Sequence, residues 1–163
     1  MKRAKRSIKG VLWERDTDSE QTLKDAIAIA REIVRLDARA GLQKAVLNTL
    51  IWNVTVSDGK YDTRYCSVAA MKEGVNRIHE HVFQRAYLVK KILENPARLS
   101  DYFKHAVSCV VTDDENAALD EIDGKLIGWA RYQAAGIVVL DRKTGKPADL
   151  VNLQEIALSQ FGP

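Results

Sequence analysis

The chain has 163 residues, which is enough for one domain with its own core or for one domain with a helical extension. Hydrophobic residues make up 46% and charged residues 29% of the chain, which is ordinary globular usage and argues against a disordered or fibrous protein. The formal net charge is +3, and the basic excess lies in an N-terminal arm formed by Lys2, Arg3, Lys5, Arg6 and Lys9. This arm favours contact with phosphate, although a solvated terminus is the plain alternative.

Three features bear on the cellular location. The longest apolar run, over 45–56, is interrupted by polar residues and falls short of the ~20 residues that a membrane span needs, so no span is predicted. The basic arm is not followed by an apolar run of the kind found in a secretory signal. Cys66 and Cys109 stand far apart without a CxxC partner, which fits neither a zinc site nor a disulfide framework. Reduced thiols predict a cytoplasmic protein.

The first third of the chain has helical periodicity. Thr17 and Glu20 have capping-box spacing, and an amphipathic helix is predicted from about 18 to 40. Gly41 then breaks or bends it, and the same periodicity continues to about Asn53. We expect 1–53 to form the basic arm and a helical segment, whose helices are also a candidate surface for a homodimer.

The next part alternates helices with short extended pieces. Residues 54–66 indicate either short β pieces around a tight turn or an ordered loop. Helices are predicted near 88–93 and after Pro96, and 106–111 is a β-type run. That run stops at Thr112, where a second capping box begins a helix that reaches about 122.

The C-terminal part contains three predicted elements. A helix over 126–135 ends at Gly136, a hairpin spans 137–151, and a last helix starts near Asn152. The fold class is therefore predicted to be α+β and mostly helical, with a small ββα-like unit and a C-terminal β-hairpin. Residues 54–163 form an α+β domain with that unit as its core, or the whole chain forms one single domain.

Two of the three histidines flank one carboxylate in His79-Glu80-His81. In a regular strand His79 and His81 project from one face and Glu80 from the other, whereas in a turn Glu80 and His81 could converge. The spacing differs from HExxH, in which the two ligands stand four residues apart on a helix. A zincin site is therefore disfavoured.

Residues 78–122 resemble the HNH, or His-Me finger, endonuclease family. The resemblance rests on Glu80-His81 at the end of a strand, on the later strand containing Cys109, and on the capped helix that carries Asn116. It departs from the family in the long helical tract over 83–105 and in the absence of an asparagine just before the second strand. Gln84 also stands near where related segments often have proline.

The resemblance implies a metal-dependent endonuclease that hydrolyses phosphodiester bonds in DNA. The general base would be His81, and a divalent ion, expected to be magnesium, would be held by Glu80 and Asn116. Such chemistry needs a base that works near neutral pH and a cation that neutralises charge on the leaving oxygen.

A non-catalytic module is the alternative. It would keep the fold and bind nucleic acid or a protein partner, as a phage or defence-associated protein, and Glu80 would then have a purely structural role. Side chains expected to contact nucleic acid in either case are His79, Arg85, Arg64, Lys5 and Arg6.

Overall fold

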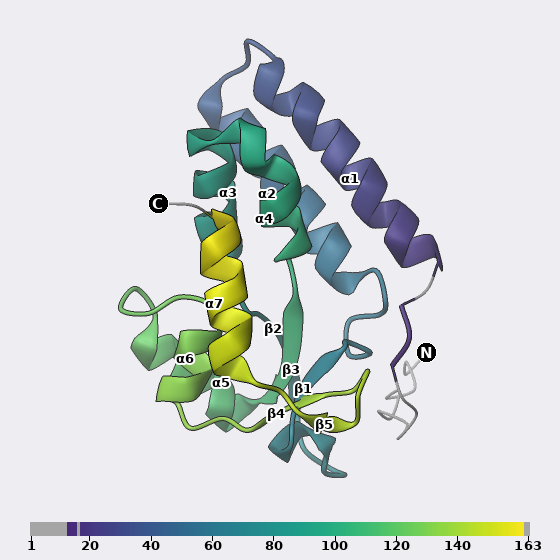
Figure 1. Cartoon of the computed structure of the whole chain (residues 1–163), viewed down its shortest axis with the longest axis vertical. Helices are drawn as coiled ribbons and strands as arrows, with labels where there is room; N and C mark the ends of the chain where they lie inside the picture. Colours follow the sequence, from purple (N-terminus) through teal and green to yellow (C-terminus); the bar gives the residue numbers. More distant parts are fainter. Residues whose placement is uncertain (1–12, 16, 162–163) are drawn as a thin grey trace.

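A five-stranded mixed sheet organises the fold, which the computed structural model describes for residues 13–15 and 17–161 (Figure 1). The strand order is β2-β3-β1-β4-β5. Strand β1 pairs in parallel with β3, and the other neighbours pair in antiparallel fashion. The strands are β1 (Tyr65–Ser67), β2 (Arg77–His81), β3 (Ser108–Thr112), β4 (Val139–Asp141) and β5 (Lys146–Pro147).

Helices make up most of the described chain. The α-helices are α1 (Thr17–Arg35), α2 (Ala40–Val56), α3 (Arg85–Glu94), α4 (Leu99–Lys104), α5 (Asp113–Ile122), α6 (Trp129–Ala134) and α7 (Leu150–Phe161). Two short 3-10 helices are η1 (Ala69–Met71) and η2 (Pro96–Arg98). The predicted α+β fold class, with its ββα-like unit and C-terminal hairpin, is confirmed.

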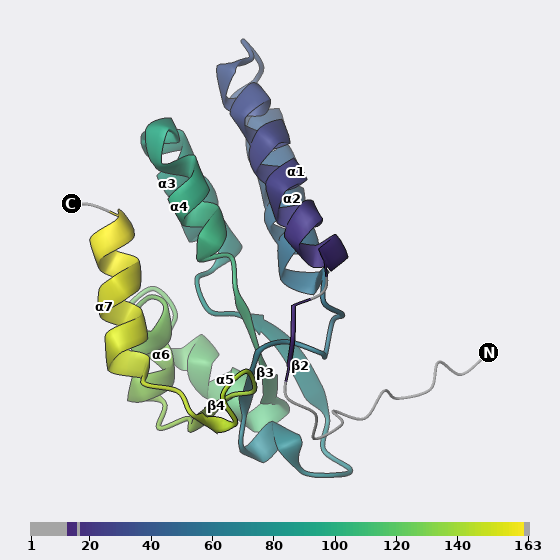
Figure 2. The same ribbon diagram turned by 45° about the vertical axis from the view of Figure 1, so that its right-hand side comes forward.

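The helices stand in three groups beside the sheet. Figure 2 shows α1 with α2, α3 with α4, and α7 as three roughly upright columns. Helix α1 packs on α2 and α4, α2 packs on α3, and α6 packs on α7. One continuous apolar core joins these groups, and at its centre lie the fully buried side chains Leu47, Ile51, Leu88, Ile92 and Leu119. Burial of such side chains is the main favourable contribution to folding.

The first helix is shorter than its periodicity predicts. It ends at Arg35 rather than near residue 40, so the break precedes Gly41, which lies inside α2. The side-chain amide of Gln43 donates to the carbonyls of Ile33 and Leu36 at 3.0 Å each. These bonds satisfy carbonyls that a helix end leaves free, which stabilises the turn between α1 and α2.

The junction from β3 to α5 follows the sequence prediction. The Thr112 hydroxyl accepts from the Glu115 amide at 3.3 Å, and the Glu115 carboxylate accepts from the Thr112 amide at 2.9 Å. The same carboxylate accepts from the Ser67 hydroxyl at 2.5 Å. The capping box therefore also ties α5 to the end of β1.

Two C-terminal boundaries differ from the prediction. Helix α6 begins only at Trp129, because Gly128 has φ +63° and ψ −142°, and a Cβ there would collide with the Phe83 ring. Helix α7 begins at Leu150 rather than near Asn152, and its first turn is capped by the Asp149 carboxylate, which accepts from the Asn152 amide at 3.1 Å. Gly136 has the expected left-handed conformation, with φ +67°.

Candidate functional site

Strand β2 is regular, so its side chains alternate between two faces of the sheet. It pairs with β3 over its whole length, with Glu80 opposite Cys109 and His81 opposite Ser108. Glu80 lies on the face that α6 covers, where it contacts Arg131. His79 and His81 contact Trp52 of α2, on the other face. The regular-strand alternative therefore describes this segment, and the order β2–β3–α5 forms the ββα unit.

Glu80 takes part in a buried ion-pair cluster. The Arg131 side chain is 1% exposed, and its two terminal nitrogens each lie 3.1 Å from Oε1 of Glu80. The same guanidinium pairs with Asp123 of the loop after α5 and donates to the His81 carbonyl at 3.4 Å. Burial raises the pKa of Glu80, and the nearby Arg131 charge opposes that rise.

Asn116 lies in the first half of α5, and its amide donates to the Asp120 carboxylate at 3.3 Å. In the observed arrangement Glu80 is bonded to Arg131 and Asn116 to Asp120. Among residues 13–15 and 17–161, no group of three or more His, Cys, Asp or Glu side chains is placed to hold a metal. The magnesium site and the role of His81 as base stay predictions.

The residues predicted to contact nucleic acid are dispersed. The Arg85 guanidinium lies 5.2 Å from the centre of the Trp52 ring, near the histidines, and His79 is 7% exposed. Arg64 lies at a separate cleft beside β1. Lys5 and Arg6 fall outside the described residues.

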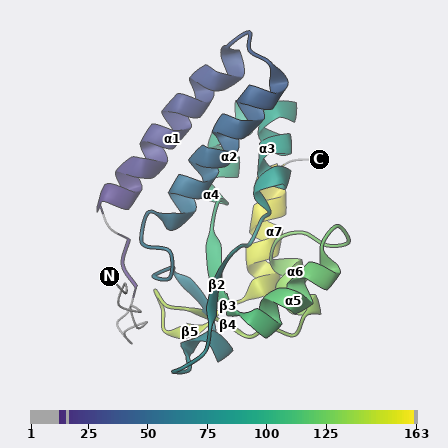
Figure 3. The ribbon, with the colours of Figure 1, turned by 180° about the vertical axis from the view of Figure 1, so that it is seen from behind.

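Figure 3 shows α5, which carries Asn116, and α6, which carries Arg131, together at the sheet end of the molecule, away from the tip of the α1–α2 hairpin.

The cleft beside Arg64 is lined by several basic side chains. It has a volume of about 380 Å³. Its walls come from the segment before α1, the end of α2, the start of β1, the α4–β3 connection, the β4–β5 turn and α7. Four cationic side chains line it, whereas Asp58 is the one carboxylate among the described lining residues; the cations are Arg15, Arg64, Lys104 and Lys143.

Arg64 is held firmly at the cleft wall. Its Nε and Nη2 donate to the two oxygens of Asp141 at 2.9 and 2.7 Å, and its guanidinium lies 4.9 Å from the centre of the Tyr65 ring. The hydrogen bond with Asp141 raises the pKa of Arg64, and the same bond lowers the pKa of Asp141. The side chain keeps 36% of its surface exposed, so part of the fork remains accessible to an anion.

The other cations are less constrained. Lys104 is 59% exposed and pairs with Asp101 at 3.1 Å, which is a weak surface pair. Lys143 is exposed on the β4–β5 turn and lines the same cleft as Asp58. The Trp13 amide donates to the Arg142 carbonyl at 3.0 Å, which holds the segment before α1 against that turn.

Two polar atoms at the cleft have no hydrogen-bond partner among the described residues. They are the indole N–H of Trp13 and Oδ1 of Asp58, and both are buried. A third lining group, the His105 ring, bonds to the Gln160 side chain at 2.7 Å, and burial lowers its pKa. Burial thus favours the neutral form of His105, and the charge of the cleft comes from Arg and Lys.

Sequence reasoning identified Arg64 but missed the rest of the cleft. Lys143 stands in a basic turn that in isolation indicates only solvated charge, and Arg15 and Lys104 carry no local signal. The basic hairpin turn follows β4, which pairs with β1 directly after Arg64, but only the structure shows this pairing.

Comparison with protein-family models, curated proteins and solved structures found no match to this chain. The residues and their geometry therefore carry the functional argument. No helix in the described part of the chain has the length and apolar character that crossing a bilayer requires.

The predicted dimer surface has exposed apolar side chains. Leu36 is 55% and Leu42 61% exposed, and both lie where α1 turns into α2. Ile29 of α1 is 48% exposed. Single exposed apolar residues are ordinary on protein surfaces, so the homodimer stays a prediction.

Proposed function

We propose that the protein is a non-catalytic nucleic-acid-binding module that holds the phosphate backbone in its basic cleft. The observation that carries the proposal is the convergence of Arg15, Arg64, Lys104 and Lys143 on one cleft from four separate segments of the chain. Cations gathered in a concave site strengthen the local potential and attract polyanions. Neutralised phosphates release counterions, which supplies most of non-specific binding.

Two further features support a polymer rather than a small anion. The lining cations come from four separate segments of the chain, so they could contact more than one phosphate of a polymer. The basic arm joins the described chain at Trp13, which itself lines the cleft. An arm with five cations is therefore connected directly to the site and extends the basic stretch in sequence.

The contacts of Glu80 favour binding over cleavage. A carboxylate that ligates magnesium must offer its oxygens to the ion, whereas Oε1 of Glu80 accepts two bonds from a fully buried guanidinium. His81 lies across the sheet from this carboxylate. Binding of an ion by Glu80 would therefore compete with its bonds to Arg131.

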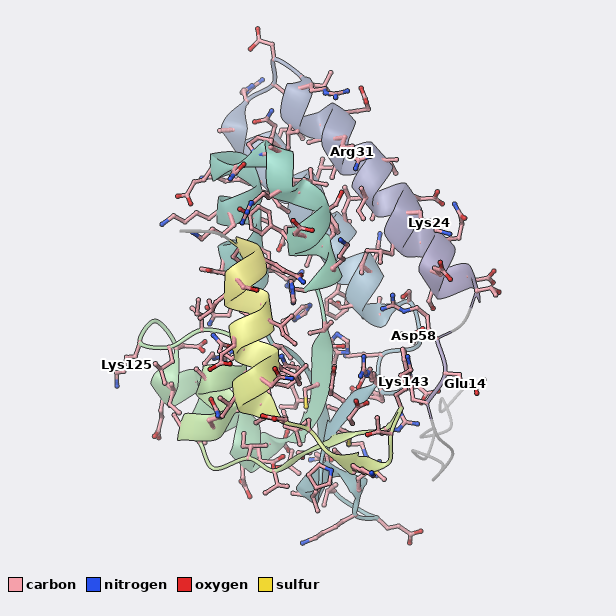
Figure 4. The ribbon with its side chains drawn as sticks, in the orientation of Figure 1. Glu14, Lys24, Arg31, Asp58, Lys125 and Lys143 are labelled. Carbon is pink, nitrogen blue, oxygen red and sulfur yellow. The ribbon has the colours of Figure 1, made fainter. Side chains whose placement is uncertain are left out.

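The test compares two double variants with the same change in net charge. Lys104→Glu with Lys143→Glu reverses charge at the cleft, and Lys24→Glu with Lys125→Glu does so far from it (Figure 4). Fluorescence anisotropy with a labelled DNA and a labelled RNA oligonucleotide measures affinity as a function of salt. We expect the cleft variant to bind at least about tenfold more weakly with a shallower salt dependence, and the control to stay within about twofold of wild type.

Equal losses in the two double variants would mean that total charge, and not the cleft, attracts nucleic acid. Wild-type protein that does not bind either oligonucleotide at low salt would overturn the proposal.

A metal-dependent HNH-type endonuclease is the second candidate, because the antiparallel β2–β3 pair followed by the capped helix α5 has the order that the resemblance predicts. It predicts cleavage of DNA in the presence of Mg²⁺ or Mn²⁺ that disappears in His81→Ala while that variant remains folded. DNA that stays intact with wild-type protein and either ion would exclude it.

A further inference from the structure

His79 and His81 form a cluster that neither candidate function uses as a pair. Their ring centres are 5.3 Å apart on one face of β2, and each lies close to Trp52, at 5.4 and 5.5 Å. The Arg85 guanidinium covers the Trp52 ring at 5.2 Å. Side chains two positions apart on a strand project from the same face, which brings the two imidazoles together.

The hydrogen bonds determine which nitrogen of each ring carries the proton. Nδ1 of His79 lies 2.7 Å from the Lys60 carbonyl, which only accepts, so Nδ1 donates. The Thr55 hydroxyl donates its proton to the Trp52 carbonyl at 2.9 Å, so it accepts from Nε2 of His81 at 3.2 Å. The bare lone pairs are therefore on His79 Nε2 and His81 Nδ1.

His79 Nε2 is a buried acceptor without a partner among the described residues, in a side chain that is 7% exposed. Buried polar atoms in native proteins almost always have a partner, and an orphan is often explained by a bound ion or water. Here the orphan belongs to a ring whose second nitrogen is already oriented by a carbonyl, which is the outer contact typical of metal-binding histidines.

The ring spacing agrees with a shared ion. With metal–nitrogen distances of about 2.0–2.1 Å and a tetrahedral angle, two imidazole centres lie roughly 5.2 Å apart. The observed separation is 5.3 Å. Imidazole ligands suit zinc, copper and nickel.

We propose that His79 and His81 bind a zinc, copper or nickel ion through His79 Nε2 and His81 Nδ1. Two protein ligands leave positions for water or an exogenous anion. The site differs in face, ligands and ion class from the magnesium site that the resemblance implies, and it does not depend on the nucleic-acid proposal.

The electrostatic surroundings act in two directions. Burial lowers the pKa of His79 and lowers that of His81 to about 3, so neither ring holds a second proton that an ion must displace at neutral pH. The charges of Arg85 and Lys60 oppose a cation and also lower these pKa values. An anionic co-ligand near Arg85 would offset that repulsion.

The test uses full-length protein without a polyhistidine tag. Calorimetric titration with Zn²⁺ and fluorescence titration with Cu²⁺ are made on wild type, His79→Gln, His81→Gln and the matched control His105→Gln, which removes the chain's third histidine. We expect saturable one-to-one binding by wild type and by His105→Gln. Each of the other two variants should bind at least about tenfold more weakly.

Trp52 supplies a signal tied to this position, because its ring contacts both imidazoles. Copper should quench its emission in wild type, and Trp52→Phe should remove the quenching while zinc affinity by calorimetry stays within about threefold of wild type.

Thr55→Val, which removes the acceptor for His81, should weaken zinc binding about tenfold.

Wild-type protein that shows no saturable binding would overturn the proposal. So would equal affinity of all three histidine variants, which would place the ion elsewhere. Far-UV circular dichroism verifies that each variant is folded, and if His79→Gln unfolds, His81→Gln decides the outcome.

Discussion

Arg131→Met tests the buried ion pair that joins α6 to β2. The Arg131 guanidinium is 1% exposed, and it pairs with Glu80 at 3.1 Å and with Asp123. Methionine has a similar length and apolar character, so the change removes the charge while largely retaining the volume. The carboxylate of Glu80, whose side chain is 18% exposed, then lacks its partner and lies near the like charges of Asp120 and Asp123.

Breaking a buried pair by removing one partner costs about 3–5 kcal/mol, because the other charge stays buried. We expect a loss of about 3 kcal/mol in the free energy of unfolding at pH 8. The loss should be smaller at pH 5, because the carboxylate of Glu80 can be neutralised by a proton at lower pH. Burial already raises the pKa of Glu80, and without the Arg131 charge the pKa rises further, so the native variant takes up a proton more readily than the unfolded chain. That contribution to stability is present at low pH and is lost as pH rises through the folded pKa.

The assay is urea unfolding followed by tryptophan fluorescence, with the urea dependence required to stay that of wild type. A double-mutant cycle with Glu80→Gln measures the coupling, and the double variant should recover at least about half of the loss. A loss below about 1 kcal/mol at pH 8, or a loss that Glu80→Gln does not relieve, would refute the view that this ion pair holds β2 and α6 together.

Three other predictions concern local features. Gly128→Ala should lower the free energy of unfolding by about 3 kcal/mol or more, because φ is positive there and the added methyl meets the Phe83 ring. Gly41→Ala, in open space within α2, should raise it by about 0.5 kcal/mol. Urea unfolding compares the two variants, and equal effects would contradict the steric reason. Thr112→Ala should lose about 1 kcal/mol in the same assay through loss of the α5 cap, and Thr112→Ser should not. Burial lowers the pKa of His105, so its contribution to stability is present above pH 6.5 and is lost as pH falls below it. Wild type should therefore lose stability on acidification faster than His105→Gln. Parallel pH profiles of the two proteins would disprove this.

Local patterns in the sequence predicted much of the secondary structure. The spacing of Thr112 and Glu115 located the start of α5, because both halves of a capping box lie within four residues. Gly136 marked the end of α6, whereas the sequence left a regular strand and a turn open for His79-Glu80-His81, and the structure has the regular strand. Helix ends were less accurate, because Arg35 and Gly128 become boundaries through contacts with Gln43 and Phe83 that periodicity does not contain.

The site depended on contacts between residues far apart in the chain. Glu80 was a plausible metal ligand from sequence, but its carboxylate is held by Arg131, 51 positions later, and no local signal connects the two. Arg64 likewise pairs with Asp141, 77 positions away. Such partners are selected by the packing of α6 on the sheet and by the pairing of β4 with β1, which decide where each charge is buried and what neutralises it.

The amino-acid sequence by itself determined the α+β class, the cap of α5 and the basic character of the N-terminal arm, because each of these depends on composition or on neighbours within a few residues. Only the tertiary structure decided that Arg15, Arg64, Lys104 and Lys143 share one cleft and that Glu80 belongs to an ion pair. The physical reason is that burial and charge pairing are set by the three-dimensional surroundings of a side chain. Spacing along the chain constrains those surroundings only over about one helical turn or one strand pair.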